Sequence, residues 1–119
     1  MKWQKTPQEL VVFLEKRLKN VKCQSRKMFG CPAYFINGNM FVGAFQKDIF
    51  IRLPPGDIKG ILEKYAEMKP FKPRAGVTMK EYVVIPEALY TRRKVFFELL
   101  NKSVRYVRTL APKKGRKEH

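Results

Sequence analysis

Apolar residues recur near the start of the chain with the spacing of a helix that buries one side. Leucines four residues apart form the stripe, and lysines occupy other parts of the helical wheel: Leu10, Leu14 and Leu18, against Lys16, Lys19 and Lys22. Thr6-Pro7-Gln8-Glu9 has the form of a capping box, with the proline at the first helical position, where its missing N–H costs nothing. We expect a helix from Pro7 to about Val21.

The stretch from Arg26 to Leu53 instead predicts three short strands with a two-residue period. Asn37-Gly38 is a strong hairpin signal, because a type I′ turn requires positive φ at both central residues. Lys47-Asp48 is the candidate for the second turn of an antiparallel meander. With these turns, Phe35 pairs with Met40, Tyr34 with Phe41, and Phe45 with Phe50.

This register sorts the side chains of the meander onto two faces. One face is wholly apolar and is expected to form the core: Ala33, Phe35, Met40, Val42, Ala44, Ile49, Ile51 and Leu53. The other carries Tyr34, Ile36, Phe41, Phe45 and Phe50, with Gly43 opposite Arg52. A sheet face in contact with water is normally polar. We therefore expect a helix of the chain, a second subunit, a ligand or a partner surface to cover this aromatic face, and its candidate partner-binding residues are Tyr34, Phe41, Phe45, Phe50 and Arg52.

The second half of the chain predicts two helices and a strand. Pro54-Pro55-Gly56 ends the meander, and Asp57 is a candidate N-cap for a short helix. Two prolines and a glycine between positions 69 and 76 indicate a loop. Glu81–Ile85 is the expected fourth strand, and an apolar stripe of helical spacing predicts a long helix from Glu87 to about Leu110.

The order of elements is therefore helix, three-stranded antiparallel meander, helix, strand and long C-terminal helix, which is an α+β sandwich. A chain of 119 residues with nine Phe, five Tyr and one Trp has enough apolar surface for one folded core. We expect a single domain over residues 1–111 and a basic, flexible tail over residues 112–119.

Charge is the second strong signal, because the net charge is +16 at pH 7. The excess lies at the two ends: residues 1–30 carry a net +6, residues 31–90 only +2, and residues 91–119 carry +8. High positive charge favours association with polyanions. The candidate nucleic-acid-binding residues lie on the last helix and the tail: Arg92, Arg93, Lys94, Lys102, Arg105, Arg108, Lys113, Lys114, Arg116 and Lys117.

Residues able to carry catalysis are scarce. The single histidine is His119, the last residue, and Cys23 and Cys31 have no further soft ligand nearby for zinc. Cys31 is expected to be a buried structural thiol, with a redox or nucleophilic role as the alternative. The sequence indicates no cofactor, no metal and no small-molecule substrate. No apolar run approaches the ~20 residues that span a bilayer, and we expect a cytoplasmic protein with reduced cysteines.

Several short motifs resemble the N-terminal domain of the TfoX/Sxy family. They are Lys27-Met28-Phe29-Gly30, Tyr34-Phe35 before the Asn37-Gly38 turn, Met40-Phe41, Phe50-Ile51-Arg52-Leu53, Phe71, Gly76-Val77-Thr78-Met79, Tyr82-Val83 and Pro86. The resemblance spans roughly residues 6–110. It implies an α+β fold akin to secretion-chaperone-like domains and an association with the regulation of natural competence and transcription, without a known catalytic site.

Three functional hypotheses follow. The leading one is a non-enzymatic regulatory or interaction module of TfoX N-terminal type, which binds a protein partner or a second copy of itself. The first alternative is a protein that binds nucleic acid directly through its basic helix and tail. The second alternative is an enzyme or redox protein that uses Cys31.

Overall fold

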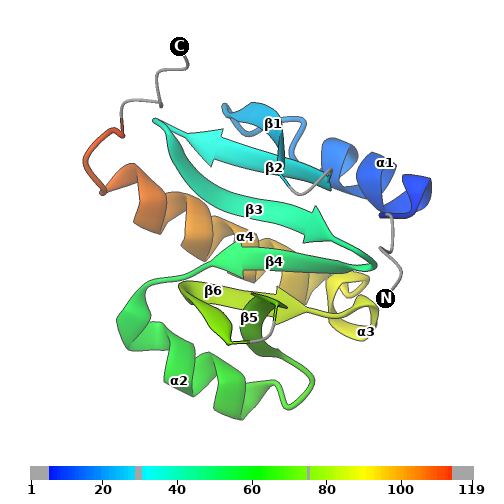
Figure 1. The fold of residues 1–119 in the computed structure, drawn as a ribbon, viewed down its shortest axis with the longest axis vertical. Helices are drawn as coiled ribbons and strands as arrows, with labels where there is room; N and C mark the ends of the chain where they lie inside the picture. Colours follow the sequence, from blue (N-terminus) through cyan, green and yellow to red (C-terminus); the bar gives the residue numbers. More distant parts are fainter. Residues whose placement is uncertain (1–5, 29–30, 75, 114–119) are drawn as a thin grey trace.

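Six strands form one antiparallel sheet in the order β1-β2-β3-β4-β6-β5 (Figure 1). The computed structural model describes residues 6–28, 31–74 and 76–113. The strands are β1 (Gln24–Met28), β2 (Cys31–Ile36), β3 (Asn39–Phe45), β4 (Asp48–Arg52), β5 (Lys69–Arg74) and β6 (Val77–Ile85). The predicted meander is therefore the centre of a larger sheet.

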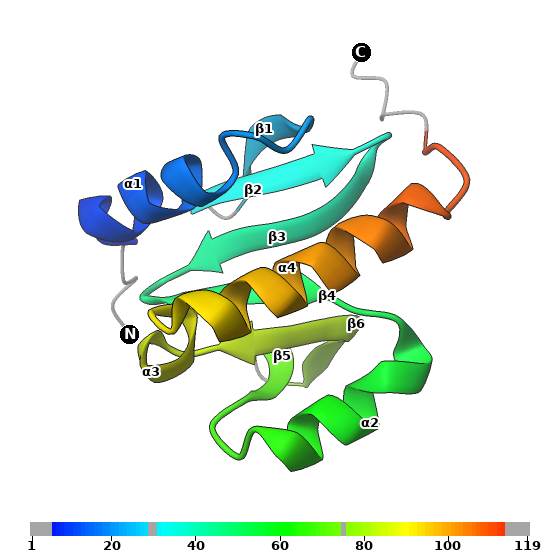
Figure 2. The same cartoon turned by 180° about the vertical axis from the view of Figure 1, so that it is seen from behind.

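The helices are α1 (Gln8–Arg17), α2 (Pro55–Lys64), α3 (Glu87–Tyr90) and α4 (Arg93–Arg108). Figure 2 shows α1, α3 and α4 over one face of the sheet, with α4 running across it, while α2 lies beside the β5–β6 end. This arrangement confirms the predicted α+β class, with an N-terminal helix, antiparallel strands and a long C-terminal helix.

The main core lies between these helices and the sheet. The leucine stripe of α1 is buried there as predicted, together with the apolar side of α4: Leu10, Leu14 and Leu18, with Phe96, Leu100 and Val107. A second, smaller cluster occupies the opposite face of the sheet and has Ala33, Met40, Phe50 and Phe71 at its centre. The sheet is thus apolar on both faces, although helices cover only one.

A bulge in β3 decides which residues point to which face. Ile36 pairs with Asn39 and Phe35 with Met40, as predicted, but Tyr34 then pairs with Val42, so Phe41 has no partner in either neighbouring strand. A bulge places one extra residue in a strand and shifts the register beyond it. The predicted Tyr34–Phe41 pair is therefore wrong.

The face assignment changes with this register. Tyr34, Ile36 and Phe41 join the helix-covered core, alongside the correctly assigned set of Val42, Ala44, Ile49, Ile51 and Leu53. Ala33, Phe35 and Met40 lie on the opposite face with Phe45 and Phe50. We call this second face, which no helix covers in Figure 1, the open face.

The turn between β3 and β4 is one residue earlier than predicted. Gln46 and Lys47 form it, with Gln46 at φ +57°, and Phe45 pairs with Asp48. Gly43 therefore lies opposite Phe50 and not opposite Arg52, whose partner is Tyr82 in β6. The predicted Lys47-Asp48 turn carried no glycine, and the residue that adopts positive φ here is a glutamine.

The β5–β6 hairpin bends over the open face. Between the Pro70–Val83 and Phe71–Met79 pairs, β6 carries three extra residues, and the central one, Glu81, has φ +73°. Bulges bend and twist a strand. In a flat sheet β4 and β5, which have β6 between them, would be ~9.6 Å apart, and side chains standing upright on them would be separated by a similar distance. The Phe71 ring of β5 instead stacks on the Phe50 ring of β4 with 4.7 Å between centroids, because the hairpin bends toward β4.

Two of these strands were not predicted, and both lie at edges of the sheet. β1 has the sequence Gln-Ser-Arg-Lys-Met, with no apolar alternation, because it forms an edge of the sheet. β5 contains two prolines, which edge strands tolerate because one side of an edge strand forms no ladder hydrogen bonds. The expected loop over residues 69–76 was therefore wrong for Lys69–Arg74.

The helix ends also differ from prediction. The Thr6 hydroxyl donates to the Cys31 thiol at 2.8 Å and makes no capping bond, and α1 ends at Arg17. Pro54 and not Asp57 occupies the N-cap of α2. The long helix is divided at Thr91-Arg92, where positions 91–94 offer no apolar side chain to the core.

The last described residues attach the end of the chain to the β2–β3 turn. The Lys113 N–H donates to the Asn37 carbonyl at 2.8 Å, and the Asn39 side-chain amide donates to the Ala111 carbonyl at 3.1 Å. Gly38 has φ +81°, and a Cβ at this position would collide with the Lys113 backbone. The rest of the expected tail, residues 114–119, lies outside the described residues.

Candidate functional site

The open face has an aromatic floor that depends on one glycine. The Phe50 ring lies against Gly43 of β3, so closely that a Cβ on Gly43 would lie 2.5 Å from Phe50 Cζ. Phe71 stacks on Phe50, with an interplanar angle of 7°, and Phe45 meets Phe71 edge-on with 5.4 Å between centroids. Phe50 is consequently buried, whereas Phe45 remains partly exposed.

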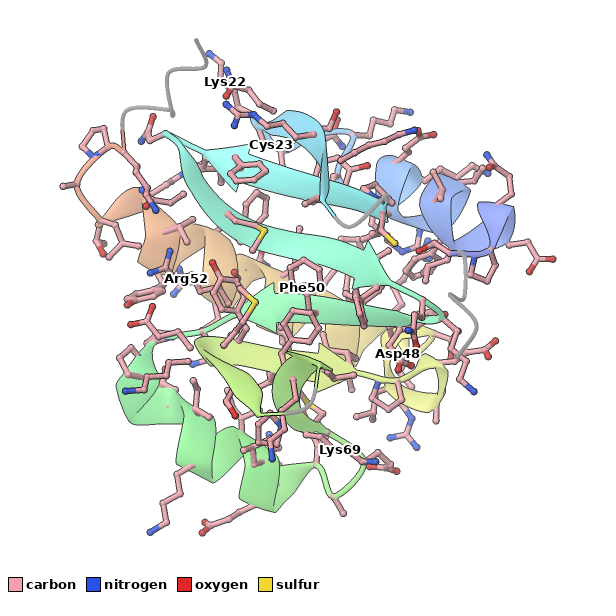
Figure 3. The ribbon with its side chains drawn as sticks, viewed as in Figure 1. Lys22, Cys23, Asp48, Phe50, Arg52 and Lys69 are labelled. Atoms are coloured by element: carbon pink, nitrogen blue, oxygen red, sulfur yellow. The ribbon has the colours of Figure 1, made fainter. Side chains whose placement is uncertain are left out.

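A shallow cavity of about 400 Å³ lies at the end of this aromatic floor. Its walls include apolar side chains of the sheet and charged side chains of β4 and β5: Phe45, Phe50, Phe71 and Val84, with Asp48, Lys69 and Lys72. Asp48 and Lys69 lie on the same side of the molecule as Phe50 (Figure 3). Burial raises the pKa of Asp48, and the charges of Lys47 and Lys69 partly oppose that rise.

Arg52 occupies a separate polar cluster at the far end of β4. Its guanidinium contacts the Glu81 carboxylate at 2.7 Å and lies over the Tyr82 and Tyr106 rings, 5.5 and 5.7 Å from their centroids. Tyr82 in turn donates its hydroxyl to the Met40 carbonyl at 2.9 Å, and burial raises the pKa of Tyr82. These contacts join β3, β4, β6 and α4, so Arg52 has a structural role.

The structure separates the five candidate partner-binding residues. Tyr34 and Phe41 are buried beneath the helices, at 7% and 0% exposure, so their assignment to an uncovered face was wrong. Phe50 lies on the open face under Phe71, and Arg52 pairs with Glu81. Phe45 is the member of the set that borders the cavity and remains partly exposed.

The described candidates for nucleic-acid binding are all exposed, but they are spread along α4. Arg92, Arg93 and Lys94 lie at its start, Arg105 and Arg108 in its last turn, and Lys113 just beyond it. A helix of this length spans ~24 Å. Lys102 lies between the two groups and pairs with Asp57 of α2 at 3.4 Å. Lys114, Arg116 and Lys117 lie outside the described residues.

A groove that the sequence did not predict lies where the β1–β2 edge meets the last turn of α4. Its walls include Lys22, Cys23, Phe35 and Arg108. Burial raises the pKa of the Cys23 thiol. These residues come from segments far apart in the sequence, so no local motif could have indicated the groove. The one available signal was the concentration of positive charge at both ends of the chain.

Cys31 is buried at 1% exposure, at the start of β2, and its thiol accepts a hydrogen bond from the Thr6 hydroxyl. Within residues 6–28, 31–74 and 76–113, no group of three or more His, Cys, Asp or Glu side chains is placed to hold a metal ion. The described helices include none with the length and apolar character needed to cross a membrane.

Comparison with known proteins identifies the domain. No curated protein and no solved structure matches the chain significantly. The sequence model of one family, the TfoX N-terminal domain, matches residues 16–107, which include all the described strands and nearly all of α4. The match spans most of the 119 residues, and the chain belongs to the TfoX N-terminal domain family.

Proposed function

We propose that this chain is a non-enzymatic regulatory module of natural competence that acts by binding a partner protein. Membership in the TfoX N-terminal domain family supports a competence-related regulatory role. The observation that carries the binding role is the open face, where an apolar cavity adjoins the partly exposed Phe45 and no helix covers the sheet. Burial of Cys31 favours binding over the cysteine chemistry considered from the sequence.

The chemistry around the cavity indicates what kind of partner would fit. The exposed side chains of Lys69 and Lys72 line it, the charge of the exposed Lys47 acts on Asp48, and Asp48 is the one acid among the described residues of its wall. Apolar floors surrounded by charge are typical of protein interfaces. A partner segment that inserts an apolar side chain beside Phe45, flanked by acidic residues, would match both features.

The test replaces Phe45 with a charged residue in cells that lack the native gene. Deletion should lower transcripts of the DNA-uptake genes and the transformation frequency, and the wild-type gene should restore both. Phe45→Arg should fail to restore them, because a charge beside the cavity floor prevents apolar docking. Thermal unfolding of the purified variant checks that the fold is retained.

Val12→Arg is the matched control. Val12 is an exposed apolar residue on α1, on the helix-covered side of the sheet, and its replacement should leave transformation unchanged. If deletion leaves both readouts unchanged, the competence role is wrong. If a folded Phe45→Arg protein restores both, the regulatory surface lies elsewhere.

Direct binding of nucleic acid is the second candidate function. The observation that favours it is the exposure of every described candidate cation on α4 and in the segment after it. Among these described residues, only Lys102 pairs with an acidic side chain. Unpaired, exposed cations are available to phosphates, and such binding should weaken steeply with added salt.

A further inference from the structure

The groove between the β1–β2 edge and the end of α4 combines charge, an aromatic ring and amide groups. It has a volume of about 720 Å³, and its walls include Lys22, Cys23, Gln24, Phe35, Asn37 and Arg108. Lys22 and Cys23 lie at the β1 corner of the molecule (Figure 3). This volume falls within the range of ~300–1,000 Å³ typical of ligand sites.

Two cations line this groove, and two more belong to residues that contact its walls. Lys22 and Arg108 line it directly. The Arg26 guanidinium lies over the ring of Phe35, 5.1 Å from its centroid, and the Lys113 backbone is bonded to the Asn37 carbonyl. The described residues that line the groove include no Asp or Glu. The groove is therefore complementary to an anion.

The aromatic and amide groups indicate which kind of anion would fit. Phe35 is partly exposed, and a guanidinium that lies over a ring offers a surface on which a nucleobase can stack. The side chains of Gln24 and Asn37 can each donate and accept hydrogen bonds, as base edges require. Bases in a duplex already stack on one another, so these groups suit a single strand.

We propose that this groove binds single-stranded nucleic acid, with phosphates held by Lys22 and Arg108 and a base stacked on the Arg26–Phe35 pair. The proposal rests on the second candidate function and gives it a site that lies mostly outside the predicted set. Of the predicted residues, Arg108 lines the groove and Lys113 adjoins it. Arg92, Arg93 and Lys94, at the other end of α4, are not part of the site.

The test measures binding of a fluorescently labelled oligothymidylate of about twelve nucleotides to the full chain by anisotropy. Titrations at about 50 and about 200 mM salt give the salt dependence. The double variant Lys22→Gln/Arg108→Gln should bind more weakly, with the slope of log affinity against log salt reduced by about 1.4, because each lost phosphate contact removes about 0.7. Phe35→Leu should weaken binding at least about fivefold with the slope unchanged, because it removes stacking and no charge.

Lys59→Gln/Lys80→Gln is the matched control. It removes the same charge from two exposed lysines beside a different cavity, between α2 and β6, and it should leave affinity and slope almost unchanged. If the groove and control variants weaken binding equally, the protein binds nucleic acid by its overall charge and the groove proposal is overturned, although the second candidate function stands. If the wild type does not bind at the lower salt concentration, the groove proposal and the second candidate function are both wrong.

Cys23 provides a second measurement on the unaltered protein. It lines the groove and is partly exposed, whereas Cys31 is buried, so N-ethylmaleimide should modify Cys23 first. Saturating oligothymidylate should slow this modification severalfold, and an unchanged rate would place the oligonucleotide elsewhere. Equal affinity for a duplex of the same length would overturn the single-strand assignment. Equal affinity for polyglutamate would overturn recognition of nucleic acid.

Discussion

The Ser103 hydroxyl on α4 donates a hydrogen bond to the backbone carbonyl of Phe41, the bulged residue of β3, over 3.3 Å. Both residues have 0% exposure. Ser103 is a polar residue on the buried side of α4, and the carbonyl of the bulged residue opposite it accepts its hydrogen bond. This contact links the register of the central hairpin to the position of the long helix.

Ser103→Ala should lower the free energy of unfolding by about 1–2 kcal/mol, because it leaves a buried carbonyl without this donor. Chemical denaturation monitored by circular dichroism measures the change. Thr109→Ala is the control, since the Thr109 hydroxyl makes a similar bond to the Tyr106 carbonyl on the protein surface, where water can replace it. Equal losses in the two variants would contradict a specific role for the bulge contact.

Gly43→Ala should destabilise the protein by about 1–3 kcal/mol, the usual cost of overpacking a core. The new Cβ would lie 2.5 Å from Phe50 Cζ and 2.8 Å from the Pro32 carbonyl oxygen, so the stacked rings would have to shift. Thermal unfolding of the single variant measures this loss.

Two further variants test that explanation. Gly60→Ala, within α2, places its Cβ in open space and should instead stabilise the protein by about 0.5–1 kcal/mol through better helix propensity. Phe50→Leu removes the ring that the new Cβ at position 43 would meet, so adding Gly43→Ala to it should cost less than the same change in the wild type. A strictly additive double variant would rule out the Gly43–Phe50 contact as the cause.

Glu81→Ala should be more destabilising than Glu81→Gly, which reverses the usual order for a strand. Glu81 has φ +73°, a conformation that costs a non-glycine residue about 1 kcal/mol or more, and it pairs with Arg52. Both variants lose the ion pair, but only glycine relieves the strain. At Lys80, whose φ is not positive, alanine should be the better tolerated of the two. Denaturant titrations of the alanine and glycine variants at both positions give four unfolding midpoints. If alanine has the higher midpoint at Glu81 as well as at Lys80, the strain at Glu81 does not contribute as proposed.

The stability of the protein should depend on Asp48 at mildly acidic pH. Burial raises the pKa of Asp48 in the folded state, so the folded protein binds this proton more tightly than the unfolded chain does. The contribution of Asp48 to stability is then most favourable below the unfolded pKa of about 3.9 and declines as the pH rises through the folded value.

Asp48→Asn should therefore be more stable than the wild type at neutral pH, and the difference should vanish below pH about 4. Unfolding midpoints measured across the acidic range give the comparison. Asp57→Asn serves as the control, because it leaves Lys102 without its ion-pair partner and should bring no gain. A wild type that is the more stable protein at neutral pH would contradict the sign of the Asp48 shift.

The sequence by itself determined the elements whose signal is local. The leucine stripe of α1, the Asn37-Gly38 turn, the central meander and the apolar side of α4 follow from periodicity and turn chemistry, and several of the family motifs lie in the meander. Each of these signals is carried by residues within a few positions of one another. The α+β class followed from their order along the chain.

Only the tertiary structure decided which faces those elements present. The bulge at Phe41 moved Tyr34 and Phe41 under the helices, and the bend at Glu81 brought Phe71 onto Phe50. Both depend on contacts across the sheet, and one unpaired residue is enough to reverse every face assignment beyond it. The basic groove was hidden for the same reason, because Lys22, Phe35 and Arg108 meet only when β1, β2 and α4 are packed together.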